Sequence, residues 1–346
     1  MAELKRFVVR RLITFIPTLI GVTLLVFIIA NLIPADPARA WAGGEKASPE
    51  VIERIREEYH LNDPWYVQYI FLMQKLLTND IVSPRTHNKI WNDLLFGTSQ
   101  GVAGAGTKYG RFFITLQLTL MAFLYIIFIG IPLGILSALK KDSPLDSAVR
   151  TLALVGVSTP VFWLGYLLIY IFFVRYRVIE LAGFPEPSQR ITGIMIIDAL
   201  LLGENDIALQ IINRLALPAF VLGFIGIGVI ARITRNSFLE TWNADYIEFG
   251  RARGLRRMRL MRHALKNALV PIVTVLGLQF GGLLGGAPIT ETVFGIPGMG
   301  RYMVEAIRNF DYPALIGGVL LFALIYMLAN LIVDIAYAFI DPRVRY

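Results

Sequence analysis

Long apolar stretches separated by polar ones dominate the chain. Six stretches contain no Asp, Glu, Lys or Arg: 12–33, 112–139, 151–174, 215–231, 268–290 and 314–333. About 20 helical residues cross about 30 Å of hydrocarbon, so all six stretches qualify as membrane spans, with 215–231 the shortest. Helices satisfy their own backbone hydrogen bonds inside a bilayer. The pattern therefore predicts an all-α polytopic membrane protein with six transmembrane helices.

Composition favours the same class. The 346 residues are 56% hydrophobic and 17% charged, whereas about a quarter of a soluble domain is charged. Six buried helices of a soluble protein would leave too little polar surface. The basic flank before residue 12 also suits a signal peptide, but 12–33 is too long and lacks a small-x-small exit before Pro34, so we expect a retained helix. The chain has no cysteine, which excludes disulfides and thiolate metal sites.

Charge asymmetry predicts the orientation. With the N-terminus inside, the cytoplasmic segments are 1–11, 140–150, 232–267 and 341–346. They hold 18 basic and 7 acidic residues, whereas the outside segments hold 15 basic and 17 acidic. The positive-inside rule thus predicts a multi-pass plasma membrane protein with both termini cytoplasmic. The net charge of +8 indicates contact with the lipid bilayer and no nucleic acid partner.

The polar segments suggest three domains. Residues 1–33 form a tail and first span, 34–111 a large extracellular insertion, and 112–346 a core that carries spans two to six and a cytoplasmic coupling loop at 236–267. The insertion is the one large polar interruption of the chain.

Within the insertion, Ser48 followed by Pro49 and Glu50 predicts a capped amphipathic helix. A second, aromatic helix begins after Pro64, and 97–110 is glycine-rich and predicts a flexible loop. Outside the insertion, 191–202 is too short to span and predicts a surface or re-entrant helix.

No motif in the sequence supplies a nucleotide site. Gly101–Lys108 approaches a phosphate-binding loop, but Thr107 stands where the lysine should follow Gly106, and no strand precedes it. Gly223, Gly226 and Gly228 resemble a dinucleotide loop only by letter, because they lie in an apolar stretch and suit close helix contacts.

The coupling loop carries the clearest functional pattern. Leu239, Trp242, Tyr246 and Phe249 are spaced 3, 4 and 3 positions apart, which predicts one apolar helical face. Gly254 then suits a left-handed helix cap. The basic residues that follow are explained by membrane topology and contact with anionic lipid. The apolar face is not, because such a face on a cytoplasmic helix needs a groove on a partner.

The segment Glu248–Gly254 resembles the Glu-Ala-Ala-x-x-x-Gly loop of ABC importer membrane subunits. Further segments are similar to dipeptide/oligopeptide-type permeases: Arg10–Leu12, Arg262–Pro271, Gly277–Leu283, Glu291–Arg301, Asp311–Pro313 and Asp341–Tyr346. The chain departs from the pattern at Phe249 and Gly250, which replace both alanines, and this leaves open which loop residue touches the ATPase.

The resemblance implies a fold, a function and partners. The fold is that of type I ABC importer permeases, and the chain forms half of a translocation path. The implied partners are a second homologous permease in a heterodimer, two cytosolic subunits that bind ATP and Mg²⁺, and an external solute-binding protein. This chain itself is then no enzyme and holds no catalytic, cofactor or metal site. Short peptides are the first expectation for the solute, with oligosaccharides or nickel as alternatives.

Three groups of residues are candidate sites. The ATPase-coupling group is Tyr246, Glu248, Phe249, Gly250, Ala252, Gly254 and Leu255. The translocation-path group is Gln279, Gly282 and Gly286, for which helix packing through overlapping GxxxG pairs is the alternative. The group for contact with the binding protein is Glu291, Arg301, Arg308 and Asp311, for which a solvated loop is the alternative.

A second class of function stays open at this point. An ion-gradient-driven secondary transporter or channel would need ionisable groups inside the membrane, and only Asp334, at the end of stretch 314–333 in the expected sixth helix, is available. An intramembrane enzyme would need a catalytic set, and no carboxylate pair or nucleophile with a neighbouring base stands out.

Overall fold

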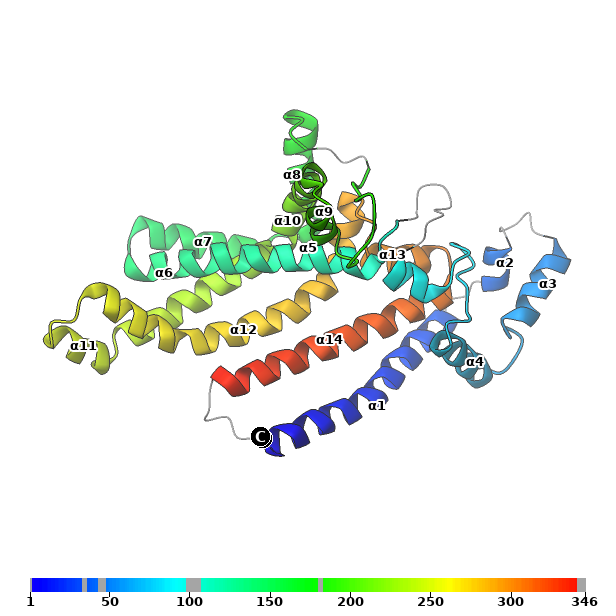
Figure 1. Cartoon of the computed structure of the whole chain (residues 1–346), viewed down its shortest axis with the longest axis horizontal. Coiled ribbons are helices and arrows are strands. Elements are labelled where there is room, and N and C mark those ends of the chain that lie inside the picture. The colour runs from blue at the N-terminus through cyan, green and yellow to red at the C-terminus, as the bar shows by residue number, and fades with distance from the viewer. Residues whose placement is uncertain (1, 33–35, 43–47, 98–106, 180–182, 341–346) are drawn as a thin grey trace. The chain divides into compact units, whose positions relative to one another are not determined.

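The computed structural model describes the chain in five stretches: residues 2–32, 36–42, 48–97, 107–179 and 183–340. Helices make up most of these stretches (Figure 1). The described residues contain no strand, and their one β pairing is an isolated bridge between Val82 and Lys89. The all-α prediction is confirmed. The glycine-rich segment 101–106 and the closing segment 341–346 lie outside the described residues.

The first half of the chain contains α1 (Ala2–Leu32), α2 (Pro37–Trp41), α3 (Pro49–Glu58), α4 (Trp65–Leu77), the π-helical η2 (Asn92–Phe96), α5 (Arg111–Tyr125), η3 (Ile126–Gly130), α6 (Ile131–Leu139), α7 (Pro144–Ser158), α8 (Val161–Ile169) and η4 (Tyr170–Arg175). The second half contains α9 (Met195–Leu201), α10 (Asn205–Trp242), α11 (Asp245–Ala252), α12 (Arg257–Phe294), α13 (Met299–Arg308) and α14 (Tyr312–Ile340).

Five described segments are long and apolar enough to cross a membrane: Val8–Leu32, Arg111–Leu139, Asn205–Trp242, Arg257–Gly285 and Tyr312–Ile332. A sixth results if α7 and α8–η4 are counted as one span. The six predicted spans are therefore present, but the third is not the straight helix expected over 151–174.

The third span breaks between α7 and α8 with a bend of 104°. Thr159 has a ψ of 123° and precedes Pro160. A residue before proline is pushed out of the helical region, and proline has no N–H to continue the hydrogen-bond ladder. The break thus follows from local backbone chemistry.

The chain divides into two compact units. Unit 1 comprises Met1–Gln117, Ala182–Ile212 and Phe294–Met327. Unit 2 comprises Leu118–Leu181, Asn213–Val293 and Leu328–Tyr346.

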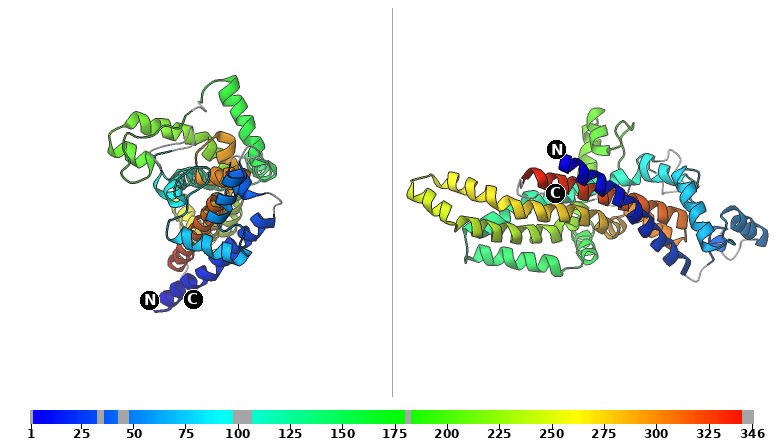
Figure 2. Two further views of the ribbon diagram at one scale, coloured as in Figure 1. Left: turned by 90° about the vertical axis from the view of Figure 1, so that its right-hand side faces the viewer. Right: turned by 90° about the horizontal axis from the view of Figure 1, so that it is seen from below.

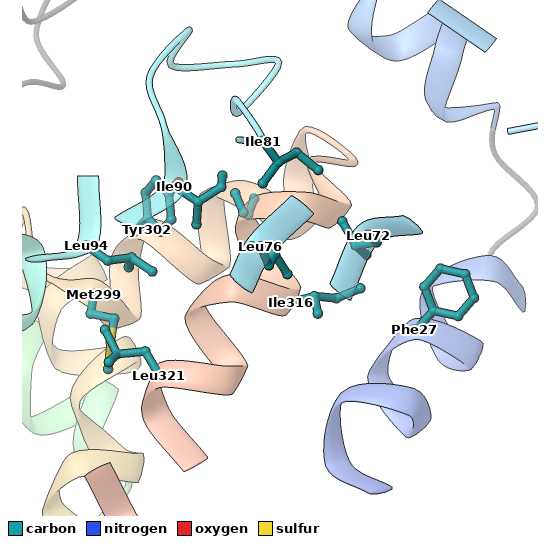
Figure 3. Close-up of a cluster of buried hydrophobic side chains, with 12 residues drawn as sticks. Phe27, Leu72, Leu76, Ile81, Ile90, Leu94, Met299, Tyr302, Ile316 and Leu321 are labelled. Carbon is teal, nitrogen blue, oxygen red and sulfur yellow. The ribbon is translucent and has the colours of Figure 1, made fainter. Parts of the chain in front are cut away.

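The insertion contributes to the hydrophobic core of unit 1. Leu76 and Ile90 are fully buried and pack with Tyr302 of α13 and Ile316 of α14 (Figure 3). The predicted insertion helices are confirmed, because the Ser48 side chain caps α3 by accepting from the Val51 N–H, and α4 follows Pro64. The predicted surface helix over 191–202 is present as α9.

Polar contacts also fasten the insertion to α13 and to the turn that follows it. The guanidinium of Arg85 lies 2.5 Å from Glu305, and Ser83 donates a hydrogen bond to Asp311. The indole N–H of Trp41 donates to the Phe310 carbonyl oxygen at 2.8 Å. In unit 1 the insertion is therefore an integral part of the fold and not an appended loop.

Glycines let the helices of unit 2 approach closely. A Cβ added at Gly223 of α10 would lie 2.8 Å from the carbonyl oxygen of Ala122 in α5. One added at Gly228 would lie 2.9 Å from the Cα of Ala153 in α7. The prediction that these glycines serve helix contacts is confirmed. In a bilayer such contacts carry much of the association, because lipid is as apolar as the side chains.

Replacing Gly223 with alanine tests this packing. The added methyl group meets a backbone atom that has no room to move, so we expect a loss of about 1–3 kcal/mol of stability. Gly282 of α12 is the matched control, because a Cβ there meets nothing within 4 Å. Gly282→Ala should raise helix stability by about 0.5–1 kcal/mol. Thermal unfolding of the detergent-purified protein measures both, and equal midpoints for Gly223→Ala and the native chain would contradict the assignment.

Candidate functional site

The predicted coupling loop folds as a short helix between two long ones. Helix α10 ends at Trp242, α11 runs from Asp245 to Ala252, and α12 begins at Arg257. Figures 1 and 2 show α11 joining the ends of α10 and α12, which run side by side within unit 2. The turn on each side of α11 therefore decides where its side chains point.

The predicted continuous apolar face is wrong in one respect. Leu239 and Trp242 belong to α10, whereas Tyr246 and Phe249 belong to α11. Ala244 separates the two helices because its backbone is extended, with a ψ of 149°. The spacing of 3, 4 and 3 therefore continues through a helix break, and the four side chains do not share one face.

One face of α11 is held against the start of α12. Ile247 and Gly250 are buried, and Leu260 of α12 is also buried. A Cβ added at Gly250 would lie 2.7 Å from the Leu260 side chain and 3.3 Å from that of Leu255. The glycine at a position where the related loop motif has alanine is thus matched by two leucines that fill the space.

Beside this buried face, α11 presents aromatic rings to the surface. Tyr246 is 43% exposed and Phe249 is 59% exposed. The guanidinium carbon of Arg253 lies 4.4 Å from the Phe249 ring centroid, within the range of a cation–π interaction. Glu248 and Ala252 are exposed on the same short helix. Exposed aromatic and arginine side chains on a rigid helix are typical of a protein-binding surface.

Gly254 ends α11 as predicted. Its φ is +75°, and its N–H donates to the Arg251 carbonyl oxygen at 2.9 Å. The Leu255 N–H reaches back to the Gly250 carbonyl oxygen at 3.1 Å. This pair of bonds is a Schellman motif, in which glycine avoids the steric cost of the left-handed region. The turn orients α12 relative to α11 without a flexible loop.

The basic residues continue along the first turns of α12. Arg256 precedes the helix, and Arg257, Arg259 and Arg262 are exposed within it. They place a strong positive charge beside the aromatic face of α11. Such a surface favours an anionic partner, either lipid headgroups or acidic protein side chains.

The candidate path residues lie along α12. Gln279 is half-buried, and its amide carbon would lie 3.9 Å from a Cβ added at Gly226 of α10. Gly282 is exposed and borders open space, so it does not serve a close helix contact within unit 2. Gly286 is in the helix, but its surroundings lie outside what the structure describes. A role of the three in a path stays a prediction.

The candidate contacts for an external protein differ in exposure. Arg308 is exposed and Arg301 is 36% exposed, with its guanidinium 2.8 Å from Glu305. By contrast, Glu291 and Asp311 are buried. In this conformation the two carboxylates are not at the surface, and their contact with a binding protein stays a prediction.

In unit 1, neighbouring groups hold the carboxylates of Asp311 and Glu305 in place. Asp311 accepts from the Ala314 N–H at 3.0 Å and so caps α14. Burial raises the pKa of Asp311, against the hydrogen bonds from Ser83 and Ala314. Burial alone would raise the pKa of Glu305 as well, but the guanidinium groups of Arg85 and Arg301 hold it below its usual range.

A buried ion pair in unit 2 was not foreseen from the sequence. Asp146 at the start of α7 is fully buried, and Arg235 of α10 binds both of its carboxylate oxygens. The partners are 89 positions apart, so no periodicity links them. The sequence carries no signal for the pair, because Asp146 lies in the charged segment 140–150 like several other ionisable residues.

The acidic and histidine side chains of the described residues form no metal centre. No group of three His, Asp or Glu side chains there is arranged to hold a metal ion. The expectation that ATP and Mg²⁺ bind elsewhere stays a prediction. The side chain of Asp334 also lies outside what the structure describes, so its predicted pairing is not tested.

Comparison with known families places the chain. Residues 130–346 match the family described as binding-protein-dependent transport system inner membrane component, and residues 4–99 match the one described as binding-protein-dependent transport system membrane component, N-terminal. The chain is 39% identical to the dipeptide transport system permease protein DppB of Escherichia coli, over 99% of both chains. It is 41% identical to DppB of Alkalihalophilus pseudofirmus, over 98% of this chain and 99% of the relative.

More distant relatives extend the range. The glutathione transport system permease protein GsiC of Salmonella choleraesuis is 35% identical, over 98% of this chain and 99% of the relative. These matches run through both units and include the α11 turn. The chain therefore belongs to the family of binding-protein-dependent transport system inner membrane components, as a multi-span permease of the peptide ABC transporter type.

Proposed function

We propose that the chain forms half of the translocation path of an ATP-driven importer for short peptides. A homologous permease forms the other half, and an external binding protein delivers the peptide. The observation that carries the proposal is the exposed aromatic face of α11, on a helix that is otherwise fixed to α12. This face lies in a chain whose relatives are named for the transport of dipeptides, tripeptides and glutathione.

Two separate cytosolic ATPases supply the energy. The sequence contains no phosphate-binding loop, and α11 offers the kind of surface that an ATPase groove recognises. Tyr246 and Phe249 insert into that groove, and the neighbouring arginines meet acidic groups at its rim. ATP and Mg²⁺ are bound by those subunits and not by this chain.

The basic segments set the orientation. The α10–α12 connection contains nine basic and three acidic residues between positions 232 and 267, which favours the cytoplasmic side. Both termini then lie in the cytoplasm, and the insertion with α13 lies outside. Arg308 and the exposed part of Arg301 are the side chains there that face a binding protein.

In the transport step, α11 and the long helices attached to it move as rigid bodies. When the ATPases close on ATP, they displace α11. Because the Schellman turn and the leucine contacts tie α11 to α12, the displacement passes into the long helices as a body movement. The path between the two permeases turns from the cytoplasmic to the external side.

Phe249→Ala tests the docking face. Removing a central aromatic anchor should weaken ATPase binding by about 2 kcal/mol or more, roughly thirtyfold. Stability of the isolated permease should change little, because the ring is 59% exposed. Trp65→Ala is the matched control, since Trp65 is 56% exposed on α4 in the insertion. Titration of ATPase subunits onto permease in nanodiscs measures the affinity, and equal affinities for the two variants would refute docking through α11.

Gly254→Val tests the turn. A β-branched residue at a φ of +75° is strained by about 1–2 kcal/mol, so the start of α12 should shift relative to α11. Peptide-stimulated ATPase activity of the reconstituted complex should fall. Gly254→Asn should retain most of it, because asparagine tolerates the left-handed region. Unchanged stimulation in Gly254→Val would show that the turn geometry is irrelevant to coupling.

Competition for uptake tests the solute class. Proteoliposomes that contain the complex and its cognate binding protein should accumulate a labelled dipeptide when ATP is inside with the ATPases. An excess of unlabelled di- or tripeptide should abolish accumulation, whereas maltotriose or Ni²⁺ should not. Uptake of the sugar or the metal without peptide uptake would replace the proposed solute while leaving the ATP-driven mechanism intact.

A further inference from the structure

Asp146 is bound on both carboxylate oxygens. Its Oδ1 accepts from the Arg235 Nε at 2.6 Å and from the Ser137 hydroxyl at 2.6 Å. Its Oδ2 accepts from the Arg235 Nη2 at 2.8 Å and from the Asp142 N–H at 3.0 Å. The Asp146 side chain has no exposed surface, and that of Arg235 is 13% exposed. This is a two-pronged, buried ion pair with fixed geometry, unlike a surface pair.

The groups around Asp146 belong to three segments of unit 2. Ser137 lies in α6, Asp142 in the turn between α6 and α7, and Asp146 in the first turn of α7. Arg235 lies in α10, seven positions before its end at Trp242 and so about two helical turns from α11. The carboxylate therefore connects the α6–α7 hairpin to the end of α10 that leads into α11.

Beyond the ion pair, α6 and α10 stay in close contact, so that they have no space to slide past each other. A Cβ added at Gly134 of α6 would lie 2.5 Å from the Ala231 carbonyl oxygen and 2.6 Å from the Cβ of Thr234. The turn itself is unusual, because Asp142 has a φ of +61°. Its N–H bond to Asp146 helps to hold that left-handed conformation. The same carboxylate thus sets the shape of the turn and its attachment to α10.

The pair is poorly explained by stability alone. A buried ion pair often contributes no more than well-packed apolar side chains, because both charges lose their water. What the pair does supply is a unique relative position for two helices that lipid alone would allow to slide. Helix α7 leads from this point to the 104° bend before α8. A displacement of α10 thus has a direct route into the third span.

We propose that Asp146 and Arg235 form a joint that makes the α6–α7 hairpin move together with α10 when the ATPases displace α11. Both are positioning residues for transport, and the proposal rests on the proposed function. In the nucleotide-free and the ATP-bound complex, the α6–α7 turn and the end of α10 keep one fixed separation. Opening of the path then requires this joint to stay intact.

Transport per ATP hydrolysed is the first test. Asp146→Asn and Arg235→Lys remove the charge match or the two-pronged geometry, so transport per ATP should fall by about tenfold while ATPase binding through α11 persists. Arg150→Gln is the matched control. Arg150 pairs with the same carboxylate, but its side chain is 54% exposed and its Nε lies 3.7 Å from Oδ1, a longer and weaker contact than that of Arg235. Its ratio should stay within about twofold of the native value. An unchanged ratio in the two joint variants would overturn the proposal.

A distance measurement tests the joint in the native pair, whatever happens to the folding of those variants. The chain has no cysteine, so spin labels on Lys141→Cys and Glu240→Cys report one distance once partner cysteines are replaced. Both positions are exposed. The distance should be the same with and without trapped ATP. A change of about 5 Å, one helical turn, would disprove the joint. Failure of the Phe249 and Gly254 tests would instead remove the docking role of α11, so the two failures are distinguishable.

Discussion

Helices in hydrocarbon gain nothing by hiding apolar side chains from one another, because lipid tails are equally apolar. The long helices of unit 2 must therefore be held by other means. Among the described residues these means include glycines that bring backbones together, as at Gly223 and Gly228 of α10, and a buried polar contact between Asp146 and Arg235 at one end. Both involve α10, the helix that leads into α11. The position of α11 is consequently determined by the packing of the spans and not by a flexible connection.

The short helix α11 combines a fixed attachment to α12 with an exposed aromatic surface. Its inner face is fixed by Leu255, Leu260 and a glycine turn, while its outer face leaves two aromatic rings in solvent. Because α11 is fixed to α12, a displacement of α11 is passed on to α12. The exposed aromatic side chains bind a partner with little loss of conformational entropy. In the same way the insertion in unit 1 is bound through Arg85 and Trp41, so it too is a rigid part of the structure.

The sequence predicted what depends on local chemistry. Apolar length identified the spans, Ser48 the start of α3, and Gly254 the end of α11. Prolines were less informative, because Pro218, Pro271 and Pro288 lie inside helices whereas Pro160 begins a new one. Whether proline ends a helix depends on neighbours that can satisfy the freed backbone groups, and these come from elsewhere in the chain.

Two further features escaped because they are not periodic. The break at Ala244 left the 3-4-3 spacing intact, and the pair of Asp146 with Arg235 joins segments far apart in sequence. Charge itself was also ambiguous. Asp311 was expected at the surface, but it caps α14 and is buried against Ser83. A short acidic residue near a helix start can either cap the helix or contact solvent and a partner, and only its neighbours in three dimensions distinguish the two roles.

The most direct test of the account places a single cysteine at Tyr246 in this otherwise cysteine-free chain. A membrane-impermeant maleimide should label Tyr246→Cys only from the cytoplasmic side of oriented vesicles, and binding of the ATPase subunits should block the labelling. Labelling from the external side, or labelling that is equally fast with and without the ATPase subunits, would contradict the central claim that separate ATPase subunits bind this permease at α11.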